Sequence, residues 1–135
     1  MIRILADSNA EGHLEVLLRH VCDGVWREFW DELNVGVVSF EDVGLERDAT
    51  DRELWRACQR EQVVLLTNNR NAKGPESLEA VLQAENRVGC LPVFTLASPE
   101  RLRWDTTYAR ETAERLVEYL AFLDEIQGVG RIYLP

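Results

Sequence analysis

Strand-like and helix-like patterns alternate along this chain, and the most constraining of them is the segment QVVLL at residues 62–66. Every residue after Gln62 in this segment is apolar and two are β-branched, so the segment has no polar face to turn toward solvent. Such a segment is typical of a central strand in a parallel sheet, which is covered by helices on both faces. The chain is therefore predicted to be an α/β protein.

The rest of the sequence supplies further strands and the helices between them. Thr50 and Glu53 have the spacing of a capping box, as do Ser8 and Glu11, and each pair predicts the start of a helix. Strands are predicted over 1–6, 35–40, 62–66 and 91–96, with an edge strand over 131–135, and helices after Ser8, after Thr50 and over 25–33, 77–85 and 107–127. We expect a single domain over residues 1–135, a mostly parallel sheet of about five strands with helices on both faces.

The charge balance limits the partners of the protein. Its 24 acidic residues outnumber its 15 basic residues, giving a net charge of −9. This excludes a histone-like or polybasic membrane-binding protein, because phosphate contacts need a local surplus of Lys and Arg. Three cysteines without a CxxC pair indicate a reduced, intracellular protein. Since the N-terminal segment does not resemble a signal peptide and no apolar stretch reaches ~20 residues, we expect a cytoplasmic protein without a membrane partner.

Polar residues gather where the predicted strands end. Asp7 follows the first strand, Asp51 opens a helix, and three amides follow the buried strand, namely Asn68, Asn69 and Asn71. In parallel α/β sheets, ligands bind outside the carboxyl ends of the strands, so these side chains are expected to converge. Carboxylate and amide oxygens are the ligands that Mg²⁺ and Mn²⁺ prefer, and such a metal can activate water and stabilise charge on a phosphate. The sequence therefore predicts a Mg²⁺ or Mn²⁺ site at this edge.

Two of these stretches, ILADSN and ATDRELWRACQREQVVLLTNNRN, resemble the PIN-like fold together with the short helix that follows them. The nearest group is the small bacterial PIN-like proteins related to the toxin-type ribonucleases of toxin–antitoxin systems, and the resemblance covers residues 1–96. In that family a strand ends in Asp, a second Asp begins a helix, and the next strand ends in Thr-x-Asp-x-Asp. Asp7 and Asp51 match the first two acids, whereas Asn69 and Asn71 stand where the last two acids are expected.

The resemblance implies a ribonuclease that hydrolyses RNA phosphodiesters with Mg²⁺ or Mn²⁺. Asp7 and Asp51 would be the catalytic residues and, with Asn69 and Asn71, the metal ligands. The two amides keep oxygen ligands but remove two negative charges, which weakens the attraction for a dication. Three glutamates are possible sources of the missing charge: Glu53, Glu76 and Glu79.

The alternative is a catalytically degenerate PIN-like protein that binds a ligand or a regulatory partner. Its binding site would be the loop after the buried strand, in which Thr67, Asn68 and Arg70 stand, together with Asn9. Structural roles explain the same residue types, because Asn suits turns and Asp suits helix starts. A homodimer through the helix at 25–33 or the helix at 107–127 is a third possibility. The chain has no GxGxxG and no P-loop, so no nucleotide cofactor is expected.

Histidine, cysteine and aromatic residues elsewhere have simpler interpretations. His13 and His20 are expected on the surface of the first helix, since no further residue at a known zinc spacing accompanies them. Cys58 follows the apolar face of its helix and is expected in the core rather than as a nucleophile. The aromatic residues at 26–30 have helical spacing, which favours core packing over partner binding.

Overall fold

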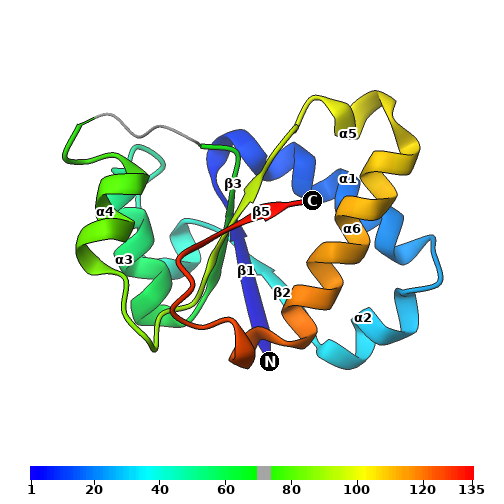
Figure 1. The fold of residues 1–135 in the computed structure, drawn as a ribbon, viewed down its shortest axis with the longest axis horizontal. Coiled ribbons are helices and arrows are strands. Elements are labelled where there is room, and N and C mark those ends of the chain that lie inside the picture. The colour runs from blue at the N-terminus through cyan, green and yellow to red at the C-terminus, as the bar shows by residue number, and fades with distance from the viewer. Residues whose placement is uncertain (70–73) are drawn as a thin grey trace.

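The computed structural model describes residues 1–69 and 74–135 and consists of one parallel sheet between two layers of helices (Figure 1). The strands are β1 (Ile2–Ala6), β2 (Val35–Val38), β3 (Val64–Thr67), β4 (Val93–Leu96) and β5 (Arg131–Leu134). The helices are α1 (Glu11–Cys22), α2 (Arg27–Leu33), α3 (Asp51–Glu61), α4 (Leu78–Glu85), α5 (Arg101–Trp104) and α6 (Thr106–Ala121). All strand pairs are parallel, in the order β2-β1-β3-β4-β5. The predicted fold class is confirmed.

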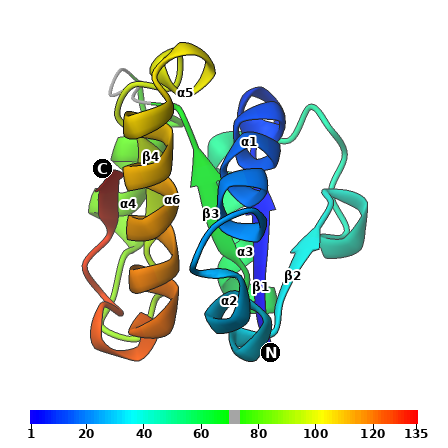
Figure 2. The ribbon, with the colours of Figure 1, turned by 90° about the vertical axis from the view of Figure 1, so that its right-hand side faces the viewer.

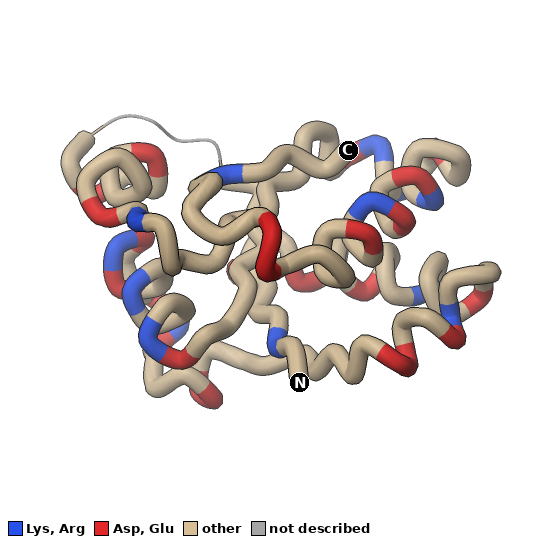
Figure 3. Tube along the Cα trace, turned by 60° about the horizontal axis from the view of Figure 1, so that its bottom comes forward, with Lys and Arg blue, Asp and Glu red and all other residues tan. Residues whose placement is uncertain are grey.

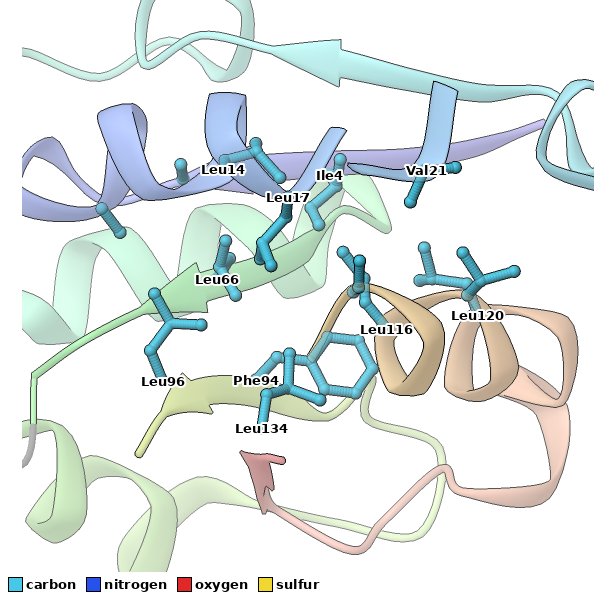
Figure 4. Packing of buried hydrophobic residues seen from close by; sticks show 14 of the residues in the cluster. Ile4, Leu14, Leu17, Val21, Leu66, Phe94, Leu96, Leu116, Leu120 and Leu134 are labelled. Carbon is cyan, nitrogen blue, oxygen red and sulfur yellow. The ribbon is translucent and has the colours of Figure 1, made fainter. Parts of the chain in front are cut away.

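The helices divide between the two faces of the sheet. Figures 1 and 2 show α3 and α4 on one face and α1, α2 and α6 on the other, with α5 beside them. The larger cluster of buried side chains lies under α1 and α6 (Figure 4) and includes Leu14, Leu17, Val21, Leu116, Leu120, Leu66 and Phe94. Each such side chain stabilises the fold by roughly 1.5–3 kcal/mol through removal of apolar area from water. Among the described residues, no helix combines the length and apolar character needed to cross a membrane.

The strand register aligns side chains in rows across the sheet. Leu5, Leu65, Val93 and Arg131 are successive partners across β1, β3, β4 and β5. The first three of these residues belong to the smaller buried cluster, which packs under α3 and α4. Because the side chains of register partners point to the same face of the sheet, the Arg131 side chain also leaves β5 on the α3–α4 face.

Helix starts agree with one predicted capping box and not with the other. At the start of α3, the Glu53 N–H donates to Thr50 Oγ1 at 3.1 Å and the Thr50 N–H donates to Glu53 Oε1 at 3.2 Å, as expected. The box predicted at Ser8 is wrong, because a 3-10 turn over Ser8–Ala10 precedes α1. The Ser8 N–H is donated to Asp7 Oδ1 at 2.7 Å, so Asp7 is the residue that caps this turn.

Several element boundaries differ from the prediction for local reasons. The buried strand begins at Val64 because Gln62, with φ +55°, ends α3 in the left-handed conformation. The second strand ends at Val38, since Ser39 N–H donates to Asp42 Oδ2 at 2.8 Å and closes a turn. The last predicted helix stops at Ala121, and a 3-10 turn then leads the chain back toward β5. Helix α5 was not predicted.

The interpretation of the aromatic residues at 26–30 holds only in part. Trp30 is buried against α1 and α6, and Trp26 packs partly buried against the same cluster. Phe29 is 37% exposed and forms an edge contact with Trp26 at 6.0 Å between ring centroids. Cys58 lies in the core of the α3–α4 face, as predicted.

Candidate functional site at the carboxyl edge of the sheet

A row of polar side chains lines the carboxyl edge of the sheet on the α3–α4 face. Each of these residues stands two positions after a member of the Leu5–Leu65–Val93 row: Asp7 directly after β1, Thr67 at the end of β3 and Thr95 in β4. The alternation of side chains along a strand therefore turns them to that same face. Thr67 and Thr95 are partners in the β3–β4 register and are both buried, while Asp7 is partly buried.

A chain of hydrogen bonds joins Asp7 to Asp51 through two uncharged residues. The Thr67 hydroxyl donates to Asp7 Oδ2 at 3.2 Å, and Thr67 Oγ1 accepts from the Asn69 backbone N–H at 2.9 Å. The Asn69 side chain then donates through Nδ2 to Asp51 Oδ2 at 2.9 Å. The structure thus brings together four of the predicted site residues: Asp7, Thr67, Asn69 and Asp51.

Asp51 owes its position to the start of α3. It is the first residue of the helix, directly after the N-cap residue Thr50 and within the capping box, where a negative charge is favoured by the helix dipole. The cap fixes the direction of the first turn, and Asp51 is then within reach of the segment after β3. Asp51 can therefore stabilise the start of α3 and belong to the candidate site at the same time.

Arg131 completes the network and was not singled out by the sequence analysis. Its Nη1 donates to the Asn69 carbonyl oxygen and to Thr95 Oγ1, both at 2.8 Å. Its Nε and Nη2 donate to Glu79 Oε2 at 3.3 and 3.2 Å. The Arg131 side chain is only 8% exposed, so a buried guanidinium joins β5, β4, α4 and the segment after β3. This cation holds the backbone of the residue whose side chain bonds to Asp51.

The turn before β5 is what brings Arg131 to the site. Gly128 and Gly130 have φ of +83° and +91°, a conformation that favours glycine. The Asn86 side chain donates to the Gly128 carbonyl at 2.7 Å, and the Val93 N–H donates to the Gly130 carbonyl at 2.7 Å. A sequence signal did exist, since a charged residue begins the otherwise uncharged segment RIYL, whose second and fourth residues are buried.

The three glutamates proposed as sources of negative charge have separate partners. Glu53 closes the capping box with Thr50. Glu76 is an exposed acid that accepts from Arg52 at 3.1 Å. Of the three, Glu79 alone joins the network, where it is bound by Arg131.

The remaining predicted loop residues lie around the same edge. Asn68 donates through Nδ2 to the Asn9 carbonyl at 3.2 Å, which ties the segment after β3 to the turn after β1. The predictions for Arg70 and Asn71 fall outside the described residues.

The buried thiol of Cys58 lies close enough to the site for the charge of Asp7 to affect its pKa. Burial raises the pKa of Cys58 to about 12, and the negative charge of Asp7 adds to this effect. The thiol is therefore protonated at neutral pH, which suits a core residue and not a nucleophile.

The donors of this site form a poor cage for a divalent metal. Asp7, Asp51 and Glu79 carry negative charge, and Arg131 returns one positive charge. Within the described part of the chain, no group of three or more His, Cys, Asp or Glu side chains is placed to hold a metal ion. Both aspartates accept hydrogen bonds from neighbours, and Glu79 is bound by Arg131. The described side chains therefore do not fit the acidic cluster that the family resemblance implies, and Mg²⁺ or Mn²⁺ binding stays a prediction.

Comparison of the chain with family models, with curated proteins and with solved structures gives no match.

Proposed function

We propose that this chain is a PIN-like protein that uses the carboxyl edge of its sheet to bind a cationic ligand or partner group, and not to hydrolyse RNA. The hydrogen bond from Asn69 Nδ2 to Asp51 Oδ2, at 2.9 Å, carries the proposal. The amide N–H occupies one acceptor site of the Asp51 carboxylate and places a donor, which cannot bind a metal, beside it, while the remaining lone pairs stay open to a ligand that donates hydrogen bonds. An aspartate at this position would instead add charge and lone pairs for a metal.

The balance of charge supports a cationic ligand. The described site holds three carboxylates, those of Asp7, Asp51 and Glu79, and one guanidinium, that of Arg131. Its net charge is therefore −2. An ammonium or guanidinium group can donate hydrogen bonds to carboxylates directly, with charge assistance. An isolated phosphate would be repelled by the same charges unless a metal or a basic segment neutralised them.

The first test compares the metal response of two single-residue variants. Asn69→Asp removes the N–H donor beside Asp51 and adds a carboxylate, and should gain stabilisation by Mn²⁺. Asn68→Asp is the matched control, because it adds the same charge in the preceding residue, whose side chain donates to the Asn9 carbonyl instead. A site with a Kd 100-fold below the Mn²⁺ concentration adds about 2.7 kcal/mol to the free energy of unfolding. Thermal melts in chelator, Mg²⁺ and Mn²⁺ measure this difference.

We expect the wild-type chain and Asn68→Asp to respond weakly to either metal, and Asn69→Asp to respond strongly. Strong Mn²⁺ stabilisation of the wild type that disappears in Asp7→Asn would refute the binding proposal. It would favour the metal-dependent ribonuclease instead.

That ribonuclease is the second candidate, and one observation favours it. Asp7 and Asp51, which match the first two family acids, lie on one hydrogen-bonded chain at the carboxyl edge. Magnesium sites can use only one or two carboxylates when substrate phosphates supply further oxygens. Incubation of single-stranded RNA with wild type, Asp7→Asn and Asp51→Asn in Mn²⁺ tests this directly. Cleavage by the wild type alone would establish the nuclease.

A further inference from the structure

Strand β2 forms an open edge of the sheet. Within the described residues it pairs with β1 alone, so the backbone groups on its other side face away from the sheet (Figure 2). Its residue Val37 is 54% exposed, whereas every residue of β3 and β4 is buried. An edge of this kind is a template for a further strand, because unpaired N–H and C=O groups are already in extended geometry.

A groove runs beside this edge on the α1 face. Val37 is the register partner of Ile4, which places Val37 on the face that α1 covers. Helix α1 lies over β1 and leaves a cavity of about 260 Å³ beside β2. Its apolar lining includes Leu14, Leu18, Val37 and Phe40, and its charged lining consists of Glu11, Glu15, Asp42 and Arg47, with Arg47 paired to Glu11. An added strand would place alternate side chains over this groove. The edge therefore offers an apolar contact in addition to backbone hydrogen bonds.

The segments on both sides of β2 are strongly acidic. Residues 27–48 hold seven Asp or Glu and two Arg, a net charge of −5 out of −9 for the whole chain; Figure 3 marks the charged residues along the trace. Glu32 precedes β2 by three residues and Glu41 follows it by three, and both are exposed. Acidic residues thus stand at both ends of the strand, with valines between them.

This charge pattern favours a partner protein with basic ends over a second copy of the chain. Two copies of β2 pairing about a twofold axis would run antiparallel and place the acidic end of one copy beside the acidic end of the other. Like charges in that position oppose association. We propose that the outer edge of β2 docks an extended segment of a partner protein, apolar in its middle and bearing Lys or Arg at both ends. The bound segment adds a sixth strand to the sheet, beside Val37, with its basic ends near Glu32 and Glu41.

This surface lies on the α1 face, while Asn69 and Asp51 belong to the network on the α3–α4 face. The inference is therefore independent of the function proposed above. The segment that docks on β2 and the cationic ligand of the carboxyl edge can belong to different molecules.

The experiment titrates three synthetic peptides of about eight residues into the full chain, with isotope-labelled protein observed by NMR. The first peptide has alternating Val and Thr in the middle and two Lys at each end. The second has the same middle and Glu in place of each Lys. The third keeps the Lys ends but has two prolines in the middle, which cannot donate the backbone hydrogen bonds of a strand. We expect saturable shifts at the amides of Gly36 and Val37 with the first peptide, and at least tenfold weaker binding of the other two.

Charge-reversal variants provide the reciprocal test. The double variant Glu32→Lys with Glu41→Lys should bind the Lys peptide about tenfold more weakly and bind the Glu peptide more tightly than the wild type does. Val37→Lys should weaken the Lys peptide by a similar factor. Glu111→Lys is the matched control, because it reverses an exposed acid on α6 and should leave binding unchanged. If Val37→Lys fails to fold, the double variant alone decides.

Four results would overturn the proposal. Equal binding of the proline peptide would mean that charge alone attracts the basic peptide and that no strand is added. Equal binding of the Glu peptide, or no binding of the Lys peptide, would remove the charge argument. Sedimentation that shows self-association of the wild type, lost in Val37→Lys, would assign the edge to a second copy of the chain.

Discussion

Replacement of Arg131 by alanine is expected to destabilise the protein by about 3 kcal/mol. Nη1 makes two hydrogen bonds of 2.8 Å, to the Asn69 carbonyl and to Thr95 Oγ1. Hydrogen bonds from a charged donor contribute roughly 1.5–3 kcal/mol each, and the cost of burying the guanidinium offsets part of that sum. The bond to Glu79 adds less than about 1 kcal/mol, because the Glu79 side chain is 39% exposed to water.

The free energy of unfolding is measured by urea titration with far-UV circular dichroism, and the slope m should stay constant because the fold is retained. Arg115→Ala is the control: Arg115 forms a salt bridge with Glu118 on the surface of α6, and its loss should cost less than about 0.5 kcal/mol. Arg131→Lys should fall between wild type and Arg131→Ala, since lysine keeps the charge without the planar fork. A loss below about 1 kcal/mol in Arg131→Ala would show that the network does not hold the edge of the sheet together.

Two further predictions concern the α3–α4 layer. Thr50→Ala removes the capping box of α3 and should lower the free energy of unfolding by about 1 kcal/mol in the same urea assay, and an unchanged midpoint would contradict the capping role. The pKa of Cys58 is raised to about 12 in the folded state from an ordinary value near 9, so the folded protein holds this proton more tightly than the unfolded chain does. That contribution to stability is complete below pH 9 and is lost as the pH rises from 9 toward 12. Unfolding at pH 8 and pH 10.5 should therefore show a smaller loss of stability in Cys58→Ala than in the wild type, and equal losses would contradict the assignment.

The order of strands and helices could be predicted because local patterns determine it. The apolar run at 62–66 predicts a buried central strand, and β3 is the middle strand of the sheet, buried along its whole length. The capping box at Thr50 predicts the start of α3, because its two hydrogen bonds join residues only three apart. The box at Ser8 failed, because the neighbouring Asp7 accepts the Ser8 N–H.

The candidate site could be predicted only in part, from the rule that ligands of parallel α/β sheets bind at the carboxyl ends of the strands. That rule places residues after the strands at one edge, and Asp7 and Asn69 are found there. It does not say which atom of an amide faces a carboxylate, and here the donor Nδ2 of Asn69 faces Asp51. Nor does it reveal Arg131, which lies 62 residues from Asn69 in the sequence and reaches it through a turn at Gly128 and Gly130.

The network explains why an amide and a buried arginine belong together at this edge. An aspartate at position 69 would stand beside Asp51 with no N–H to donate, and two neighbouring carboxylates repel each other unless a cation lies between them. Arg131 does not supply that cation, because its Nη1 is directed at the Asn69 backbone carbonyl and at Thr95. In chelator, Asn69→Asp should therefore be less stable than the wild type by about 2 kcal/mol, the contribution of one hydrogen bond to a charged group. A bound cation such as Mn²⁺ would restore that loss. The wild-type edge is held together by its own hydrogen bonds, whereas an acidic cluster would need a cation.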